Sequence, residues 1–362
     1  MIMPLSGNKG EWSEIYVLLK LLGDKKVYAG DAELNKIEEL FYPILKILRN
    51  EQRKRLEYSI DDNIVIVAED GNELLRKSVS DFLNIAKDLL DIIQRSKSTF
   101  SAPEIERFMS EIHCSTLKAK SQDKTDIRIV IHDLRTGMTP TLGFSIKSQV
   151  GSNSTLLNAG RSTNFCYRIL GCDMSDAQIE AINSINTNKK ILDRVKSIID
   201  LSGSLRYVGM DDIIFNNNLV LVDSLLPQIV SEILLRCYST GIYDLKENTT
   251  AVATTNPLNY DTTGNHAYYA HKIKNLLVAS ALGMVPHTPW NGKYDANGGY
   301  LVVKENGDIL CYHFYDRNLF EDYLFENTKL ETPSTSKYDF GKLFRGSDNN
   351  LYFKLNLQIR FK

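Results

Sequence analysis

The sequence predicts an α+β fold in which a mixed sheet is flanked by helices. Three observations support this prediction. Apolar residues recur at helical spacing through most of residues 1–120, they alternate strictly over residues 126–148, and the C-terminal part combines a hairpin signal with an alternating terminal strand. The mix of expected helices and strands changes near residue 205. We therefore expect two parts, residues 1–205 and 206–362, which could share one core.

The helical pattern is strongest in the N-terminal part and returns in the middle of the chain. One expected helix contains Pro43, and another begins after Ser101 with Pro103 in its first turn, where proline is well tolerated. The spacing of apolar residues predicts helices over residues 12–22, 33–49, 72–95, 103–118, 176–199, 219–238 and 266–282.

Strands are expected where apolar residues alternate with polar ones. Besides residues 126–148, short strands are predicted over residues 64–68, 300–303 and 309–314, and a longer one over residues 351–361. The two strands after residue 299 flank Glu305-Asn306-Gly307-Asp308, in which Asn-Gly is a strong signal for a tight hairpin turn.

Composition is that of an ordinary globular protein, with 362 residues, 43% hydrophobic and 24% charged. No apolar run approaches the roughly 18 residues that span a bilayer, and the first residues lack a signal-peptide pattern, so we expect a cytoplasmic protein. The cysteines form no C-x-x-C pair, which argues against structural zinc and disulfides; they are Cys114, Cys166, Cys172, Cys237 and Cys311.

Charge is unevenly distributed along the chain. The formal net charge of -2 is not that of a protein that binds nucleic acid by a general basic excess. Residues 127–172, however, hold five lysines and arginines against the single acid Asp133. This local excess of positive charge would suit an anionic partner that binds beside residues 127–172.

The hairpin of residues 126–132 and 143–147 carries the first candidate site. Its isoleucines and Phe144 form one apolar face, so the opposite parity places Asp126 on the same face as Ser145 and Lys147. Matching the two faces requires paired residue numbers with an odd sum near 273, which would set Asp126 opposite or nearly opposite Lys147, with about 5 Å between Cβ atoms. An exposed cross-strand salt bridge would give the same pattern.

An acid and a lysine that project together suit metal-dependent hydrolysis of a phosphodiester. The carboxylate can hold Mg²⁺, the metal activates a bound water, and the lysine offsets charge that develops on the phosphate. Asp133 has the wrong parity and lies toward the far end of the hairpin, so we reject it as a metal ligand.

One carboxylate is missing from this hairpin. Nucleases of this kind usually have an acid two residues before the lysine, and here that position is Ser145. Glu14 or Glu11 could replace it, because both flank the buried stripe of the helix expected over residues 12–22. Acids also favour the first turn of a helix because of its dipole, which is the structural alternative for both.

Two further segments have side chains suited to DNA. The segment after Lys147 offers polar groups for phosphates and base edges, namely Gln149, Ser152, Asn153, Thr155, Asn158, Arg161 and Asn164. The polar face of the terminal strand contains no acid and consists of Lys354, Asn356, Gln358, Arg360 and Lys362, of which we assign the first four to DNA. A solvated loop would have the same composition as the segment after Lys147, and a sheet with one solvent-exposed face would explain the terminal strand equally well.

The chain resembles the HpaII-type restriction endonucleases over nearly its whole length. The resemblance is carried by NKGEWSEIY (8–16), KTDIRIVIHD (124–133), GFSIKSQVGSNSTLLNAGRSTNF (143–165), LGMVPHTPWNG (282–292), ENTKLETPSTSKYDFG (326–341) and KLNLQIRF (354–361). It implies a PD-(D/E)XK fold and Mg²⁺-dependent cleavage of double-stranded DNA at a short palindromic CCGG-type target. We expect residues 206–362 to form an added C-terminal α+β region that recognises DNA. Asp126 and Lys147 match the first acid and the lysine of the motif. Ser145 departs from it.

Two other classes of function compete with this interpretation. Asn256-Pro-Leu-Asn-Tyr260 is similar to the N-P-P-Y motif of DNA methyltransferases, although its third and fourth positions differ and no glycine-rich cofactor turn accompanies it. The serine at position 145 would also fit a DNA-binding protein that has lost catalysis. As a restriction enzyme, the chain would have a cognate methyltransferase as a functional partner rather than a subunit, and it could act as a homodimer.

Overall fold

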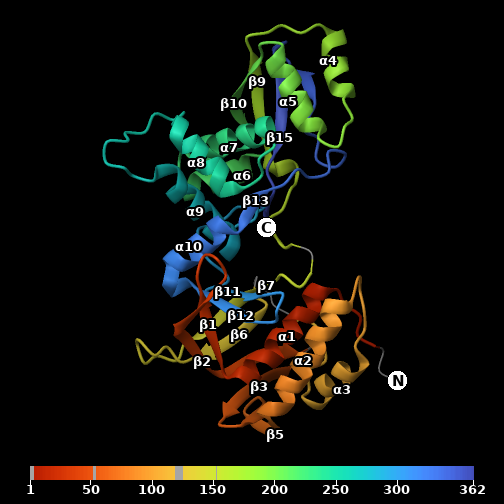
Figure 1. Cartoon of the computed structure of the whole chain (residues 1–362), viewed down its shortest axis with the longest axis vertical. Helices are drawn as coiled ribbons and strands as arrows, with labels where there is room; N and C mark the ends of the chain where they lie inside the picture. The colour runs from red at the N-terminus through yellow and green to blue at the C-terminus, as the bar shows by residue number, and fades with distance from the viewer. Residues whose placement is uncertain (1–3, 52–53, 119–124, 152) are drawn as a thin grey trace. The chain divides into compact units, whose positions relative to one another are not determined.

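The computed structural model describes residues 4–51, 54–118, 125–151 and 153–362. Its chain divides into two compact units, which Figure 1 shows by residue number. Unit 1 comprises Met1–Ser154 and Tyr294–Tyr323, and unit 2 comprises Thr155–Lys293 and Leu324–Lys362. This division differs from the expected change near residue 205 in two ways: residues 155–205 belong to unit 2, and a late hairpin, residues 299–313, returns to the sheet of unit 1.

Unit 1 is built on a nine-stranded mixed sheet, in the order β1-β12-β11-β7-β6-β2-β3-β4-β5. Strand β11 runs parallel to β7 and antiparallel to β12, and β12 runs parallel to β1. The strands are β1 (Lys26–Gly30), β2 (Lys36–Glu51), β3 (Lys54–Asp61), β4 (Ile64–Glu69), β5 (Asn72–Ser78), β6 (Ile127–Ile131), β7 (Thr141–Ser148), β11 (Gly299–Val303) and β12 (Ile309–His313).

Helices α1 (Lys9–Asp24), α2 (Val79–Arg95) and α3 (Pro103–Glu111) lie side by side against this sheet (Figure 1). Their apolar stripes and the sheet share one core, in which Trp12, Phe82 and Ile129 are fully buried. Burial of such side chains contributes about 1.5–3 kcal/mol each. The first two turns of α1, which hold both candidate acids, are therefore fixed on a rigid layer.

Strands β6 and β7 pair as an antiparallel hairpin with the expected parity. Ile127 is level with Phe144, and Ile129 is level with Leu142. The pairing is two residues away from the expected register, so Asp126 lies level with Ser145 instead of Lys147. A shift of two residues keeps the same side chains on the buried face, so burial alone allows either register. The turn after β6 selects the observed one. There the Asp133 side chain accepts a hydrogen bond from the Arg135 amide at 2.9 Å.

Residues 33–49 were expected to be helical, and this prediction is wrong, because β2 runs from Lys36 to Glu51. It pairs with β1, β3 and β6, and these neighbours override its local pattern. Pro43 is tolerated next to an irregularity in the β2–β6 pairing. Residues 72–78 likewise form a strand, β5, which follows an Asp70-Gly71 turn with both φ angles positive.

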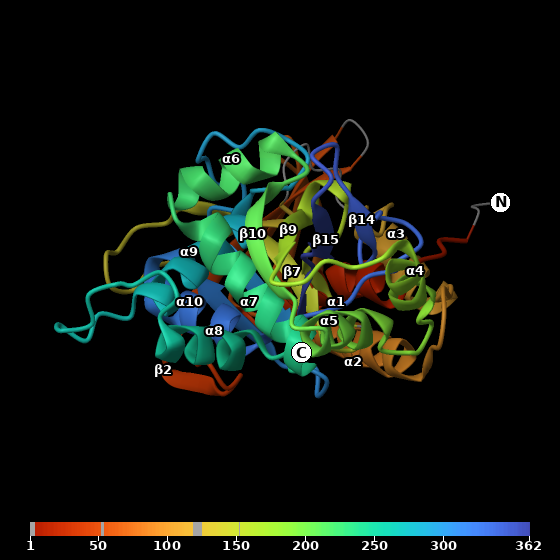
Figure 2. The same ribbon diagram turned by 90° about the horizontal axis from the view of Figure 1, so that it is seen from above.

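Unit 2 combines two small sheets with helices. Figure 2 shows strands β10, β9, β15 and β14 in that order, and the second sheet has the order β13-β16-β8. The strands are β8 (Thr155–Leu157), β9 (Asn164–Leu170), β10 (Ser204–Met210), β13 (Thr328–Leu330), β14 (Leu343–Arg345), β15 (Leu351–Asn356) and β16 (Ile359–Phe361). The terminal strand that the alternation predicts is thus two strands in different sheets, separated by Leu357 and Gln358.

The helices of the middle of the chain are shorter than the periodicity predicts. The expected helix of residues 176–199 is two helices, and the pattern missed α8 and α10. The helices are α4 (Asp176–Ser184), α5 (Lys190–Asp200), α6 (Ile213–Val222), α7 (Leu226–Thr240), α8 (Leu245–Thr255), α9 (Tyr268–Leu282) and α10 (Arg317–Glu326). In the described ranges no single helix has the length and apolar character to cross a membrane; only the bent pair α6 and α7 meets the criteria jointly.

Candidate active site

Asp126 is held in place at the start of the β6–β7 hairpin. Its amide donates to the Phe144 carbonyl at 2.9 Å, and its Oδ2 accepts hydrogen bonds from Ser145 Oγ at 3.0 Å and from the Ile146 amide at 2.7 Å. Ser145 is buried, with 7% of its surface exposed. The serine therefore does not replace the carboxylate that is missing from the motif, but orients the one that is present.

Lys147 projects from β7 on the same face as Ser145, as the parity predicts. Its Nζ lies 5.0 Å from the centroid of the Tyr300 ring, on the neighbouring strand β11. Burial lowers the pKa of Lys147, and the negative charges of Asp126 and Glu14 oppose that shift. The lysine is thus under the electrostatic influence of both candidate carboxylates.

Glu14 belongs to the same cluster of charges, although it is far from the hairpin in sequence. Burial, together with the charge of Asp126, raises the pKa of Glu14 to about 8. The first turn of α1 is anchored to the end of β7 and the residues after it, since Ser13 Oγ donates to Ser148 Oγ at 2.9 Å and Lys9 Nζ donates to the Val150 carbonyl at 3.1 Å. The fold therefore brings Glu14, Asp126 and Lys147 together.

Glu11 has a structural explanation that Glu14 lacks. It is the N3 residue of a capping box, in which its Oε2 accepts a hydrogen bond from the Asn8 amide at 2.8 Å. Its other oxygen forms an ion pair with Lys118 at 3.2 Å. The hydrogen bond from Asn8 is the main reason why the pKa of Glu11 is lowered. These contacts favour Glu14 as the second carboxylate.

Asp133 lies at the other end of β6 from Asp126. It is buried, and although burial opposes ionisation, hydrogen bonds from Arg135 and Thr136 and the charge of Arg135 lower its pKa overall. Arg135 in turn pairs with Asp316 at 2.7 Å. Asp133 thus has a structural role in the turn.

Sequence reasoning missed a buried ion pair next to this cluster. Arg49 and Glu51, on β2, are 5% and 3% exposed, and Glu51 also accepts hydrogen bonds from Ser115 and Thr116. The positive charge of Arg49 counteracts the rise in the pKa of Glu14. Residues two apart share a face only in a strand, so the expected helix over residues 33–49 concealed this pair.

The polar segment after Lys147 is divided between the two units. Gln149 and Asn153 belong to unit 1, and Thr155 begins unit 2. Asn158 and Arg161 are exposed and remain candidates for contact with DNA. Ser152 lies outside the described residues.

Two amides that were expected to contact DNA are instead buried in unit 2, which corrects the prediction for both. Asn164 and Asn356 are 0% exposed. Asn356 Nδ2 donates to Asn164 Oδ1 at 2.7 Å, and Asn164 Nδ2 donates to the Tyr338 carbonyl at 2.8 Å. Buried amides with satisfied hydrogen bonds hold the end of β15 against β9, and they cannot reach a base edge.

The cations of the terminal strands have acidic partners from neighbouring elements. Lys354 pairs with Asp211 at 2.9 Å, and Arg360 pairs with Glu331 at 2.8 Å. The strand itself contains no acid, as expected, but its surroundings supply them. Gln358 is partly buried, and its carbonyl accepts a hydrogen bond from the Glu331 amide. Any DNA contact by Lys354 or Arg360 would therefore replace an existing ion pair.

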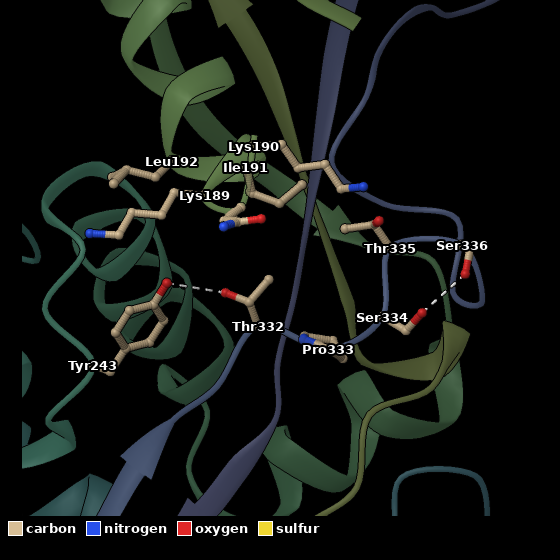
Figure 3. Close-up of a pocket in the computed structure, with 11 residues that line it drawn as sticks. Lys189, Lys190, Ile191, Leu192, Tyr243, Thr332, Pro333, Ser334, Thr335 and Ser336 are labelled. Carbon is tan, nitrogen blue, oxygen red and sulfur yellow. Dashed lines mark hydrogen bonds between the residues drawn. The ribbon is translucent and has the colours of Figure 1, made fainter. Parts of the chain in front are cut away.

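A pocket in unit 2 provides a second group of basic and hydroxyl side chains (Figure 3). Lys189 and Lys190, at the start of α5, are among its lining residues. The hydroxyl groups of Tyr243 and Thr332, which also line it, are 3.4 Å apart. Lysines and hydroxyls are common partners of phosphate oxygens. Sequence reasoning did not single out these residues, because they are distant in sequence, although Thr332 lies in the segment 326–341 that carries part of the family resemblance.

No group of three His, Cys, Asp or Glu side chains placed to hold a metal ion occurs among the described residues. Mg²⁺ does not require such a cage, because it keeps several waters and is commonly bound by one or two carboxylates. Asp126 and Glu14 are a donor set of that kind. A buried carboxylate with a raised pKa beside a second carboxylate is also an environment that a divalent cation would stabilise.

The comparisons with known proteins define the class of this enzyme. The family model described as HpaII restriction endonuclease matches residues 8–361. The chain belongs to the HpaII restriction endonuclease family, and it is thus a type II restriction endonuclease, a hydrolase that cleaves DNA. It is 46% identical over 359 residues to the type II restriction enzyme HpaII of Haemophilus parainfluenzae, with 98% of each chain covered. No solved structure matches the chain.

Proposed function

We propose that this enzyme hydrolyses double-stranded DNA with Mg²⁺ at a short palindromic CCGG-type target, on a PD-(D/E)XK core. The observation that carries this proposal is the convergence of Asp126, Glu14 and Lys147, with Ser145 bonded to the Asp126 carboxylate. The family and the HpaII relative support the DNA substrate and the target. The β6–β7 hairpin in a mixed sheet, with α1 against it, supports the core.

Asp126 and Glu14 would hold the metal. When bound, Mg²⁺ would lower the pKa of a coordinated water and neutralise charge on the scissile phosphate. Ser145 and the Ile146 amide direct one oxygen of Asp126 and leave the other available as a ligand. Lys147 would place its ammonium beside the phosphate and offset the charge that develops there.

The proposed partners follow from the substrate. A palindromic target has two-fold symmetry, so a homodimer would present the same site to both strands. A separate methyltransferase with the same target would protect the DNA of the host, and the enzyme would act in the cytoplasm, where that DNA lies. Arg161 and Asn158 would contribute to DNA binding from the start of unit 2.

The structure offers another explanation for the features that suggested a non-catalytic DNA-binding protein or a DNA methyltransferase. Glu14 supplies a carboxylate near Asp126, so Ser145 no longer indicates a decayed active site. The methyltransferase-like segment is a turn stabilised by its own asparagine. Asn256 Nδ2 donates to the Tyr260 carbonyl at 2.8 Å, and the Tyr260 amide donates to Asn256 Oδ1 at 3.0 Å.

Incubation of the purified enzyme with unmethylated plasmid DNA and Mg²⁺ tests this function. We expect discrete fragments whose mapped ends all lie at CCGG sites, and no cleavage when EDTA is present. The Asp126→Asn protein, purified in parallel, is the control for contaminating nucleases. Fragments with ends at unrelated sequences would contradict the proposed target, and cleavage in EDTA would contradict the metal.

The terminal strands allow a prediction about specificity. Arginine can bind guanine with two hydrogen bonds, and such a contact discriminates by about 1–3 kcal/mol, whereas a lysine on phosphate favours no sequence. We expect Arg360→Ala to weaken binding to a CCGG duplex about 10- to 100-fold and to a scrambled duplex much less. Lys354→Ala should weaken binding to both duplexes alike and reduce the salt dependence. Titrations in Ca²⁺ at two salt concentrations measure these effects.

Glu331→Gln is the matched control, because it removes the ion-pair partner of Arg360 and leaves the arginine in place. If Arg360 reads DNA, this variant should bind the CCGG duplex at least as well as the wild type. Equal losses on both duplexes for Arg360→Ala would instead assign this strand to backbone contact or to the structure of unit 2.

A further inference from the structure

We propose that Tyr300 is a positioning residue that holds the Lys147 ammonium over its ring and so keeps the lysine directed at the scissile phosphate. This inference rests on the proposed function, in which Lys147 acts on that phosphate. Tyr300 belongs to the late hairpin that returns to unit 1, and the sequence motifs do not include it.

The sheet places Tyr300 beside the catalytic hairpin. Strand β11 runs parallel to β7, with Tyr300 level with Ser145 and Val302 level with Lys147. Level residues of neighbouring strands share a face, so Tyr300 lies on the face that carries Ser145 and Lys147. The distance of 5.0 Å from Lys147 Nζ to the ring centroid is within the roughly 6 Å over which a ring attracts a cation.

The ring is a fixed surface for the lysine. Tyr300 is 1% exposed, and its ring packs edge to face on that of Phe320, with 5.3 Å between centroids. Phe320 is itself fully buried. Burial raises the pKa of the Tyr300 phenol, and the charges of Tyr323 and Asp126 raise it further, so the phenol stays neutral. Tyr300 therefore contributes its ring face rather than a proton.

Lys147 needs such a guide because its stem is flexible and two carboxylates attract it. An ammonium that collapsed onto Asp126 or Glu14 would occupy the oxygens proposed for the metal. Within the ranges described by the structure, Lys147 forms no ion pair with a carboxylate, and its ammonium lies near the Tyr300 ring. The ring thus keeps the lysine close to the carboxylates and separate from them.

The test compares variants that keep or remove the ring. Tyr300→Phe keeps the ring and should cleave a CCGG duplex within about threefold of the wild-type rate in single-turnover experiments with Mg²⁺. Tyr300→Leu and Tyr300→Met remove the ring and should be about 10-fold slower. Their Kd for the same duplex in Ca²⁺ should stay within about threefold of wild type, since Lys147 acts on the rate.

Phe82→Leu is the matched control for the loss of a buried aromatic ring, because Phe82 packs edge to face on Phe108 elsewhere in unit 1, as Tyr300 packs on Phe320. It should lower Tm without slowing cleavage. Ring-less Tyr300 variants that cut at the wild-type rate would overturn the inference, and so would Tyr300→Phe if it were as slow as Tyr300→Leu. If Lys147→Ala itself cut normally, the proposed function would fail instead.

Discussion

Replacing Asp126 by Asn or Lys147 by Ala is expected to lower the rate of DNA cleavage by about 100- to 1000-fold or more. Asn cannot supply the negative charge that the metal needs, and Ala removes the charge that faces the phosphate. Asp126 and Lys147 share one face of the hairpin and influence each other electrostatically. Single-turnover cleavage of a CCGG duplex in Mg²⁺ measures the loss, with circular dichroism to confirm folding.

Asp133→Asn is the matched control, because Asp133 has the same side chain as Asp126 but lies at the other end of β6. Asn retains the oxygen that accepts the hydrogen bond from the Arg135 amide. We expect this variant to keep most of the activity. A folded Asp133→Asn protein that is inactive, beside an active Asp126→Asn protein, would refute the assignment of the site.

Glu14→Gln should produce the second large effect, a loss of cleavage with binding to the CCGG duplex in Ca²⁺ largely retained. The amide preserves the shape of the side chain but removes the charge that completes the metal site. A loss of about 100-fold or more in the single-turnover rate is expected, as for other groups that stabilise developing charge. Raising the Mg²⁺ concentration should restore part of the rate.

Glu11→Gln provides the comparison within the same helix turn. Gln keeps an oxygen that can accept the capping hydrogen bond from Asn8 and loses only the ion pair with the exposed Lys118, so Glu11→Gln should change stability by less than about 1 kcal/mol and leave cleavage nearly unchanged. If Glu11→Gln abolished cleavage and Glu14→Gln did not, the second carboxylate would be Glu11. If both variants cut normally, neither acid would belong to the metal site.

The sequence predicts the main face of the site because burial fixes strand parity. Alternation of apolar residues sufficed to place Asp126, Ser145 and Lys147 on one face. The register was two residues away, because a two-residue shift preserves every buried position and only the turn distinguishes the alternatives. The order of the sheet, and with it Tyr300 beside Lys147, depends on contacts between distant strands that no local pattern contains.

Elements with two compatible patterns were harder to predict. The apolar residues of 36–51 fit a helix as well as a strand, and the surrounding strands decide the outcome. Amides present a similar difficulty, because Asn164 and Asn356 look like surface groups in sequence. Their burial is possible only because each finds hydrogen-bond partners across β9 and β15.

The position of bound Mn²⁺ in crystals of the enzyme with a CCGG duplex would show which carboxylates hold the metal. Mn²⁺ takes oxygen ligands as Mg²⁺ does, and its anomalous scattering locates it independently of any assumed site. We predict a peak between the carboxylates of Asp126 and Glu14, adjacent to a DNA phosphate and on the side of Lys147. A peak held by other carboxylates, such as Asp133 with Asp316, and none at Asp126 would contradict the account.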